Sequence, residues 1–270
     1  MVQSMSRGIE FDVNSDGVAL LRVNRPASRN ALTWAAQEAF AEAVAAAGRD
    51  AAGRDPAVRV LILTGAGAAF VSGGDLKELA GHPEPAAGER LNRGMSAALA
   101  ALTELPAPVI AAINGDAIGG GCEILTACDL RIAAAGARFA FRQVHNGLTT
   151  GWGGTARLVT LIGQSRAMEL LLTGRVFDAE EAYRLGLVHR VVPPGVDVLD
   201  AAYSWAGELL QMPRQALAAG KALVHAAAHL SPADANRLEA QLFINLWPSA
   251  DHIEAMAAFA DKRPPQFNQA

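Results

Sequence analysis

The chain is poor in cysteine, in aromatic residues and in charge. Among its 270 residues are two cysteines, aromatic residues make up 6%, and the net charge is −4. Two cysteines within one apolar stretch are too few for a disulfide framework, so we expect Cys122 and Cys128 to be buried thiols of a cytoplasmic protein. A slightly acidic chain offers no basic surface, which argues against nucleic acid or an anionic membrane as its main partner.

Signals for membranes, targeting and metals are also missing. The longest apolar run, residues 109–128, is interrupted by three polar side chains and would make a poor membrane span. Residues 1–13 lack the apolar segment of a signal peptide. His225 and His229 share a helical face, but no third ligand lies near them in the sequence, so we predict no metal site.

What the sequence does contain is an alternation of strand and helix patterns. This alternation predicts a layered α/β core with parallel strands over residues 1–200, with Thr33 beginning a helix and Gly48 ending it. From about residue 200 only helical patterns remain, and their apolar residues exceed what one helix face needs. We therefore expect residues 201–270 to pack on the core or on another subunit. Strand patterns occur at 9–14, 18–25, 58–65, 109–113, 130–134 and 187–193, and helix patterns at 33–48, 88–104, 155–172 and 178–186.

Two glycine-rich corners stand out. In AFVSGGDLKEL (69–79), Ser72, Gly73 and Gly74 precede Asp75, which occupies the position of a helix N-cap. In INGDAIGGGCEIL (113–125), three glycines precede a helix that carries Glu123 in its first turn. Three glycines at a helix start cost about 1 kcal/mol each relative to alanine, so a chain segment or a ligand must approach that backbone closely.

Together the two corners predict a binding site. Both follow strands that we expect to be parallel, so both should reach the same edge of a sheet, where α/β proteins bind ligands. Both expose backbone N–H groups at a helix start. Two N–H groups that converge on one oxygen form an oxyanion hole, in which losing one donor costs about 3–4 kcal/mol of transition-state stabilisation.

These segments resemble the crotonase superfamily, the enoyl-CoA hydratases and isomerases. The resemblance implies a spiral of ββα repeats with a helical C-terminal trimerisation region, assembled as a homotrimer or a dimer of trimers. It also implies a coenzyme A thioester as substrate and no separate cofactor. The matching segments are NRPASRNAL (24–32), LILTGAGAAFVSGGDLKEL (61–79), INGDAIGGGCEILTACDLRIA (113–133), GWGGTARL (151–158), IGQSRAMELLLTG (162–174) and AFADKRPPQF (258–267).

The resemblance also assigns roles to individual positions. The backbone N–H groups of Ser72 and Gly120 would form the oxyanion hole, and Glu123 matches the first catalytic glutamate of the hydratases. The acyl-CoA would be bound by eight residues, with the adenine near the first two and the phosphates near the last: Ala31, Leu32, Ser72, Gly73, Gly74, Asp75, Gly120 and Lys262.

One position departs from the hydratase pattern. Hydratases carry a second glutamate in a Pro-Glu pair, and counting back from Gly147 and from 153–155 puts that pair at Arg142–Gln143. Glutamine can hold a water molecule but cannot exchange a proton near neutral pH, and a general acid–base group is typically worth about 10²–10⁴-fold in rate. Efficient hydration therefore becomes an open question.

Four functions remain compatible with the sequence. We place a hydratase-type lyase first, in which Glu123 would activate water or supply the proton and Gln143 would position the water. A decarboxylase of a malonyl-type acyl-CoA needs no strong base, because loss of CO₂ generates the enolate, and Arg142 or His145 could meet the departing carboxylate. An isomerase would shuttle a proton on Glu123. The fourth is an acyl-CoA-binding protein without catalysis. His145 could act as an acid in any of the catalysed reactions.

Overall fold

The computed structural model describes residues 3–5, 7–51 and 58–268 of the chain. Residues 1, 2 and 6 of the N-terminal stretch considered above lie outside this part. A seven-stranded sheet has the order β1-β2-β3-β4-β6-β8-β11, antiparallel between its first three strands and parallel in the rest. Its strands are β1 (Gln3–Met5), β2 (Ile9–Val13), β3 (Val18–Val23), β4 (Val60–Gly65), β6 (Val109–Ile113), β8 (Leu130–Ala134) and β11 (Arg190–Val192).

A second sheet, which the sequence patterns did not predict, has four very short strands in the order β10-β9-β7-β5. β5, β7 and β9 are parallel, and β10 is antiparallel to β9. The two glycine-rich corners follow β5 and β7, so this small sheet brings them to a common edge. Its strands are β5 (Ala69–Val71), β7 (Asp116–Ile118), β9 (Arg138–Ala140) and β10 (Phe177–Asp178).

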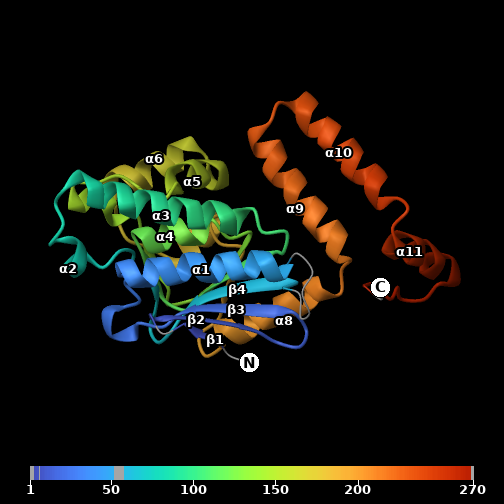
Figure 1. Cartoon of the computed structure of the whole chain (residues 1–270), viewed down its shortest axis with the longest axis horizontal. Coiled ribbons are helices and arrows are strands. Elements are labelled where there is room, and N and C mark those ends of the chain that lie inside the picture. Colours follow the sequence, from blue (N-terminus) through green and yellow to red (C-terminus); the bar gives the residue numbers. More distant parts are fainter. Residues whose placement is uncertain (1–2, 6, 52–57, 269–270) are drawn as a thin grey trace.

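Helices cover both faces of the seven-stranded sheet (Figure 1). On one face, α1 (Trp34–Ala51) and α3 (Pro85–Thr103) pack against alternate strand residues such as Leu61 and Leu63. The intervening residues Val60 and Ile62 point to the other face, where α8 (Val198–Leu210) covers them. This alternation explains why β4 reads as a continuous apolar run, since it is buried on both faces.

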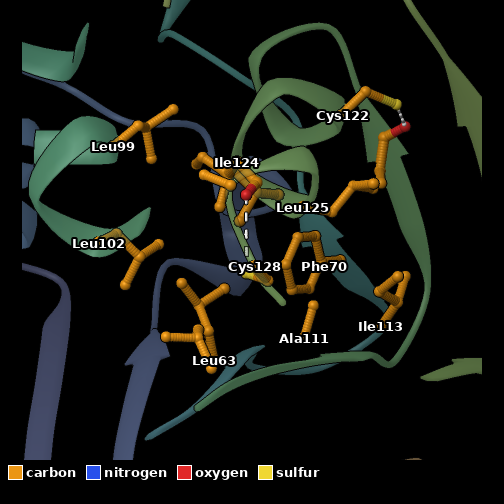
Figure 2. Packing of buried hydrophobic residues seen from close by; sticks show 14 of the residues in the cluster. Leu63, Phe70, Leu99, Leu102, Ala111, Ile113, Cys122, Ile124, Leu125 and Cys128 are labelled. Atoms are coloured by element: carbon orange, nitrogen blue, oxygen red, sulfur yellow. Dashed lines mark hydrogen bonds between the residues drawn. The ribbon is translucent and has the colours of Figure 1, made fainter. Parts of the chain in front are cut away.

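The short helix α4 (Gly120–Thr126) lies in the apolar core beneath α3, as Figure 2 shows for Ile124 and Leu125 near Leu99 and Leu102. The two cysteines are free and buried, as expected. Burial raises the pKa of both thiols, that of Cys128 to about 12, so both remain protonated and unreactive.

The remaining helices surround the site or follow the core. Figure 1 shows α9 and α10 as a helical pair that leans away from the sheets, with α11 at its far end. The large apolar side chains of this region include Phe243, Trp247 and Phe259, all strongly exposed. The assignment of residues 201–270 to subunit contacts stays a prediction. The bounds are α2 (Leu76–Leu79), α5 (Gly154–Ile162), α6 (Gln164–Thr173), α7 (Ala179–Leu185), α9 (Arg214–His229), α10 (Pro232–Leu246) and α11 (Ala250–Asp261), with 3₁₀ turns η1 (Pro26–Ser28) and η2 (Arg142–Asn146).

Two helix ends differ from the sequence prediction. Thr33 accepts a hydrogen bond from the Ala36 N–H and so caps α1 as predicted, but α1 continues through Gly48 to Ala51. A Cβ atom added at Gly48 would lie 3.4 Å from the Leu105 side chain, an ordinary contact distance, so Gly48 is an interior helix position and not a helix end. The predicted helix 155–172 is divided at Gly163, whose φ of 82° ends α5 and begins α6.

Candidate active site

A cavity of about 810 Å³ opens beside the edge where the two corners meet. It is large enough for a substantial small-molecule ligand. Of the sequence-predicted site residues, it is lined by Ala31, Ser72, Gly73, Gly74, Asp75, Gly120, Glu123 and Gln143.

The two corners are in direct contact. Gly73 has a φ of +87°, and a Cβ atom added there would lie 2.9 Å from the Gly120 nitrogen. The first corner is anchored from behind by Leu32, whose N–H donates to the Gly73 carbonyl and whose carbonyl accepts from the Asp75 N–H. Asp75 in turn caps α2 by accepting from the Lys77 N–H. The N-cap prediction is therefore confirmed, although the helix is only four residues long.

Two main-chain N–H groups at this contact are left without acceptors. Within the described part of the chain, neither the Ser72 N–H nor the Gly120 N–H donates a hydrogen bond to another group. Gly120 is the first residue of α4, where N–H groups have no partner inside the helix. Unpaired donors beside a cavity are suited to bind a ligand oxygen.

The three consecutive glycines are explained by close packing of chain segments. Gly119 adopts a φ of 56° with a ψ of −116°, which a residue with a side chain rarely adopts. A Cβ atom on Gly120 would lie 2.2 Å from Cζ3 of Trp152, and one on Gly121 would lie 1.9 Å from the Val71 carbonyl oxygen. The close approach that the sequence predicted is thus made by the Trp152 ring and by β5.

Glu123 is a buried carboxylate surrounded by hydrogen-bond donors. It is 2% exposed. Its Oε2 accepts from the N–H groups of Trp152 at 2.7 Å and Gly154 at 3.0 Å. Its Oε1 accepts from the Gly151 N–H at 3.2 Å and from Nε2 of Gln143 at 2.8 Å. Two carboxylate oxygens offer about four lone-pair positions, so these donors occupy the full acceptor capacity of the group.

These bonds place Glu123 at the N-terminus of α5, where the helix dipole favours a negative charge. Helix α5 begins at Gly154, and a Cβ atom there would lie 2.5 Å from Cγ of Glu123. Only glycine therefore lets the chain approach the carboxylate this closely. The sequence indicated that Glu123 was unusual, but not that it would bind the loop 151–154.

The side-chain amide of Gln143 is hydrogen-bonded through its nitrogen but not through its oxygen. Its Nε2 donates to Glu123, which fixes the orientation of the amide. Its Oε1 is buried and has no hydrogen-bond partner among the described residues. A buried acceptor without a donor is costly, so a ligand or water that donates a hydrogen bond there would be stabilised.

Sequence reasoning missed the structural role of Arg157 and left that of Trp152 open. The Trp152 ring is 4% exposed, lines the cavity and lies against Gly120. Arg157 donates from Nη2 to the carbonyls of Trp152 and Glu123, and from Nε to the Thr126 hydroxyl. For the tryptophan of GWGG, the sequence left open whether its ring lines the site or packs beneath glycines, and the structure shows both contacts.

Three predicted site residues do not line the cavity. The ring of His145 is exposed, and its Nε2 lies 2.9 Å from the Thr173 carbonyl oxygen. Lys262 is exposed at the end of α11 and is not among the residues that line the cavity. Leu32 is fully buried, so its main chain holds the first corner while its side chain fills the core. His145 and Lys262 therefore have no contact with the site within this chain as described.

No helix in the described part of the chain is long and apolar enough to cross a membrane. The same residues contain no cluster of three or more histidine, cysteine or acidic side chains that could hold a metal ion.

Comparison with known proteins agrees with this architecture. The family model for enoyl-CoA hydratase/isomerase matches residues 13–270. A probable enoyl-CoA hydratase of Mycobacterium tuberculosis is 38% identical over 250 residues, covering 93% of this chain and 94% of the relative. The crotonyl-CoA hydratase of Syntrophomonas wolfei is 37% identical over 257 residues, with the same coverage.

Solved structures agree as well. The crystal structure of an enoyl-CoA hydratase from Bacillus anthracis has a TM-score of 0.90 and 33% identity, covering 97% of this chain and all of that chain. An enoyl-CoA hydratase subunit from Geobacillus kaustophilus has a TM-score of 0.88 and 38% identity. The expected crotonase-like fold is confirmed, and the chain belongs to the enoyl-CoA hydratase/isomerase family.

Proposed function

We propose that the protein is an acyl-CoA lyase of the enoyl-CoA hydratase type. The observation that carries this proposal is the pair of unpaired N–H groups of Ser72 and Gly120, which lie at the same cavity as Glu123. Together they provide donors for a thioester oxygen and a single carboxylate for proton transfer. The names of the hydratase relatives support the same activity.

In the proposed reaction the thioester carbonyl oxygen accepts hydrogen bonds from the Ser72 and Gly120 N–H groups. These bonds strengthen as negative charge develops on that oxygen, so they stabilise the enolate more than the bound substrate. Segments 72–75 and Ala31 line the cavity and hold the coenzyme A part, which enters with the substrate. No separate cofactor takes part in the proposed reaction.

Proton transfer in this proposal depends on one carboxylate. The attacking water donates one hydrogen bond to the free Oε1 of Gln143. Glu123 removes the other proton of the water while the water oxygen bonds to the β-carbon, and the electron pair of the double bond moves onto the thioester as the enolate. Glu123 then returns a proton to the α-carbon of the enolate. To accept that proton, Glu123 must release one of its four donors. The Gly151 N–H, at 3.2 Å, is the most distant of them. Because only one carboxylate transfers protons, we expect hydration to be slower than in a site with two carboxylates.

The test is the hydration of crotonyl-CoA, followed by loss of enone absorbance. The wild-type protein should turn over, and Glu123→Gln should reduce kcat by about 10²–10⁴-fold, the range for losing a general acid–base group. Because the new amide would place an NH₂ group against the N–H donors of loop 151–154, folding must be checked by circular dichroism. A folded Glu123→Gln variant with the wild-type rate would refute the role of Glu123.

A second candidate, decarboxylation of a malonyl-type acyl-CoA, is favoured by the occupied lone pairs of Glu123. Cleavage of the bond to the carboxylate releases CO₂ and leaves its electron pair as the enolate. This step needs the oxyanion donors but no base. Release of CO₂ from methylmalonyl-CoA or ethylmalonyl-CoA, without hydration of crotonyl-CoA, would select this reaction.

The homotrimeric or hexameric assembly and the cytoplasmic location belong to this proposal and rest on the family resemblance. The exposed apolar side chains of α10 and α11 support an assembly through the C-terminal region. Sedimentation at micromolar concentration would test it, and a monomer would contradict it.

A further inference from the structure

The charges that line the cavity are not balanced. Its acidic side chains are all engaged: Asp75 pairs with Arg25, Asp116 pairs with Arg138, and Glu123 accepts its four hydrogen bonds. The cationic side chains that line the cavity have no carboxylate within ion-pair distance in the described part of the chain. They are Arg29, Lys77 and Arg142.

Arg142 differs from the other two cations by its place in the cavity. Arg29 and Lys77 lie within two residues of Ala31 and Asp75 in the sequence, in the segments around the first corner. Arg142 begins η2 and directly precedes Gln143, whose amide is bonded to Glu123. Its guanidinium makes one long contact, 3.4 Å from Nη1 to the Gly174 carbonyl oxygen, and has no other hydrogen-bond or ion-pair partner among the described residues. It is therefore the cation on the Gln143 side of the cavity.

In the part of the cavity lining that follows Arg142 along the chain, polar side chains outnumber the apolar ones, which are Leu148 and Trp152. Asn146, Thr149 and Thr150 line this part together with the unpaired Oε1 of Gln143. An alkyl chain placed there would displace water from these groups without replacing its hydrogen bonds, which is unfavourable. An arginine with free N–H donors is well suited to bind a carboxylate in a bidentate manner.

We propose that the preferred substrate is an enoyl-CoA whose acyl chain carries a second carboxylate beyond the double bond, and that Arg142 binds this carboxylate. The inference rests on the proposed function for the position of the thioester. It names the substrate class as an α,β-unsaturated dicarboxylic acid linked through one end to coenzyme A. The Arg142 guanidinium then acts on specificity and takes no part in proton transfer.

Binding of inert analogues tests the proposal independently of turnover. Glutaryl-CoA and pentanoyl-CoA have the same chain length, and only the first carries the distal carboxylate. Isothermal titration should give glutaryl-CoA an affinity about 10–100-fold higher, as expected for charge-assisted hydrogen bonds. In Arg142→Met this ratio should fall to about one, and Arg142→Lys should retain part of it because lysine supplies charge without the bidentate geometry.

Arg93→Met is the matched control, because Arg93 is exposed on α3 and pairs only with Glu89 in the described residues. It should keep the wild-type preference. Equal affinity of the wild-type protein for the two analogues would overturn the proposal, as would an unchanged ratio in a folded Arg142→Met variant. Turnover is then compared on glutaconyl-CoA and 2-pentenoyl-CoA. Absence of hydration on both, with the glutaryl preference intact, would refute the proposed function while leaving this inference standing.

Discussion

Replacing Gln143 by glutamate converts the site into one with two carboxylates. In the wild-type protein, Nε2 of Gln143 donates to Oε1 of Glu123 at 2.8 Å. Gln143→Glu exchanges that donor for an oxygen with almost no change in shape. At this distance, two negative charges repel by about 6 kcal/mol for an effective dielectric constant of about 20.

The repulsion exceeds the free energy needed to retain a proton. Keeping one ordinary glutamate protonated at pH 7 costs about 4 kcal/mol, because its unperturbed pKa is about 4.3 and each pH unit is worth about 1.4 kcal/mol. The variant should therefore hold one shared proton between its two carboxyl groups at neutral pH. Its stability should equal that of the wild type near pH 4. The folded pair keeps a proton that the unfolded chain releases, so stability should decrease as the pH rises above that value.

The shared proton also supplies an acid beside a base. Crotonyl-CoA hydration should therefore increase by about 10²-fold, the lower end of the range for a general acid–base group. The rate should follow a bell-shaped pH profile. The assays are loss of enone absorbance from pH 5 to 9 and urea unfolding over the same range. Gln164→Glu, on the exposed surface of α6, is the matched control and should change neither. No gain in rate, together with a stability difference that does not depend on pH, would show that Gln143 does not lie at the reacting position.

Two further predictions concern the contact between Gly120 and Trp152 and the lowered pKa of His189. Gly120→Ala should lower kcat by about 10²–10³-fold, as for the loss of one oxyanion donor, because its Cβ would displace the Trp152 ring. Gly94→Ala, a helical position with no atom within 4 Å of an added Cβ, should leave kcat unchanged, and equal effects of the two changes would contradict this reasoning. Partial burial and the charge of Arg131 lower the pKa of His189 to about 4, below its unfolded value of 6.5. The unfolded chain binds a proton first as the pH falls, so stability should decrease between pH 6.5 and 4, by no more than about 1 kcal/mol because the ring is partly exposed. Urea unfolding of His189→Asn should show a smaller decrease over this range, and an unchanged decrease would assign the effect to other groups.

The long apolar patterns predicted the larger sheet well, and the second sheet was missed for a physical reason. The strand 109–113 was predicted with its observed bounds, because a strand buried on both faces must be apolar throughout. Strands of two or three residues, such as β7 and β10, contain too few residues to show a period. The convergence of the corners was predicted, but it was attributed to the larger sheet, whereas β5 and β7 of the small sheet produce it.

The sequence by itself determined the local chemistry of the site. The glycines provide backbone conformations and close approaches that other residues cannot. A glutamine at the position where the family resemblance implies a glutamate cannot exchange a proton near neutral pH, whatever the fold. These properties belong to single residues or to short segments, so they can be read before the chain is folded.

Only the tertiary structure decided how these groups are connected. The loop 151–154 donates three N–H groups to Glu123, although it lies roughly thirty positions further along the chain. Among the described residues, the same packing leaves Oε1 of Gln143 unpaired, places Arg142 in the lining of the cavity without a carboxylate partner and places His145 outside it. Such contacts join segments that are distant in sequence, and their distances arise only when the two sheets and the helices between them pack together.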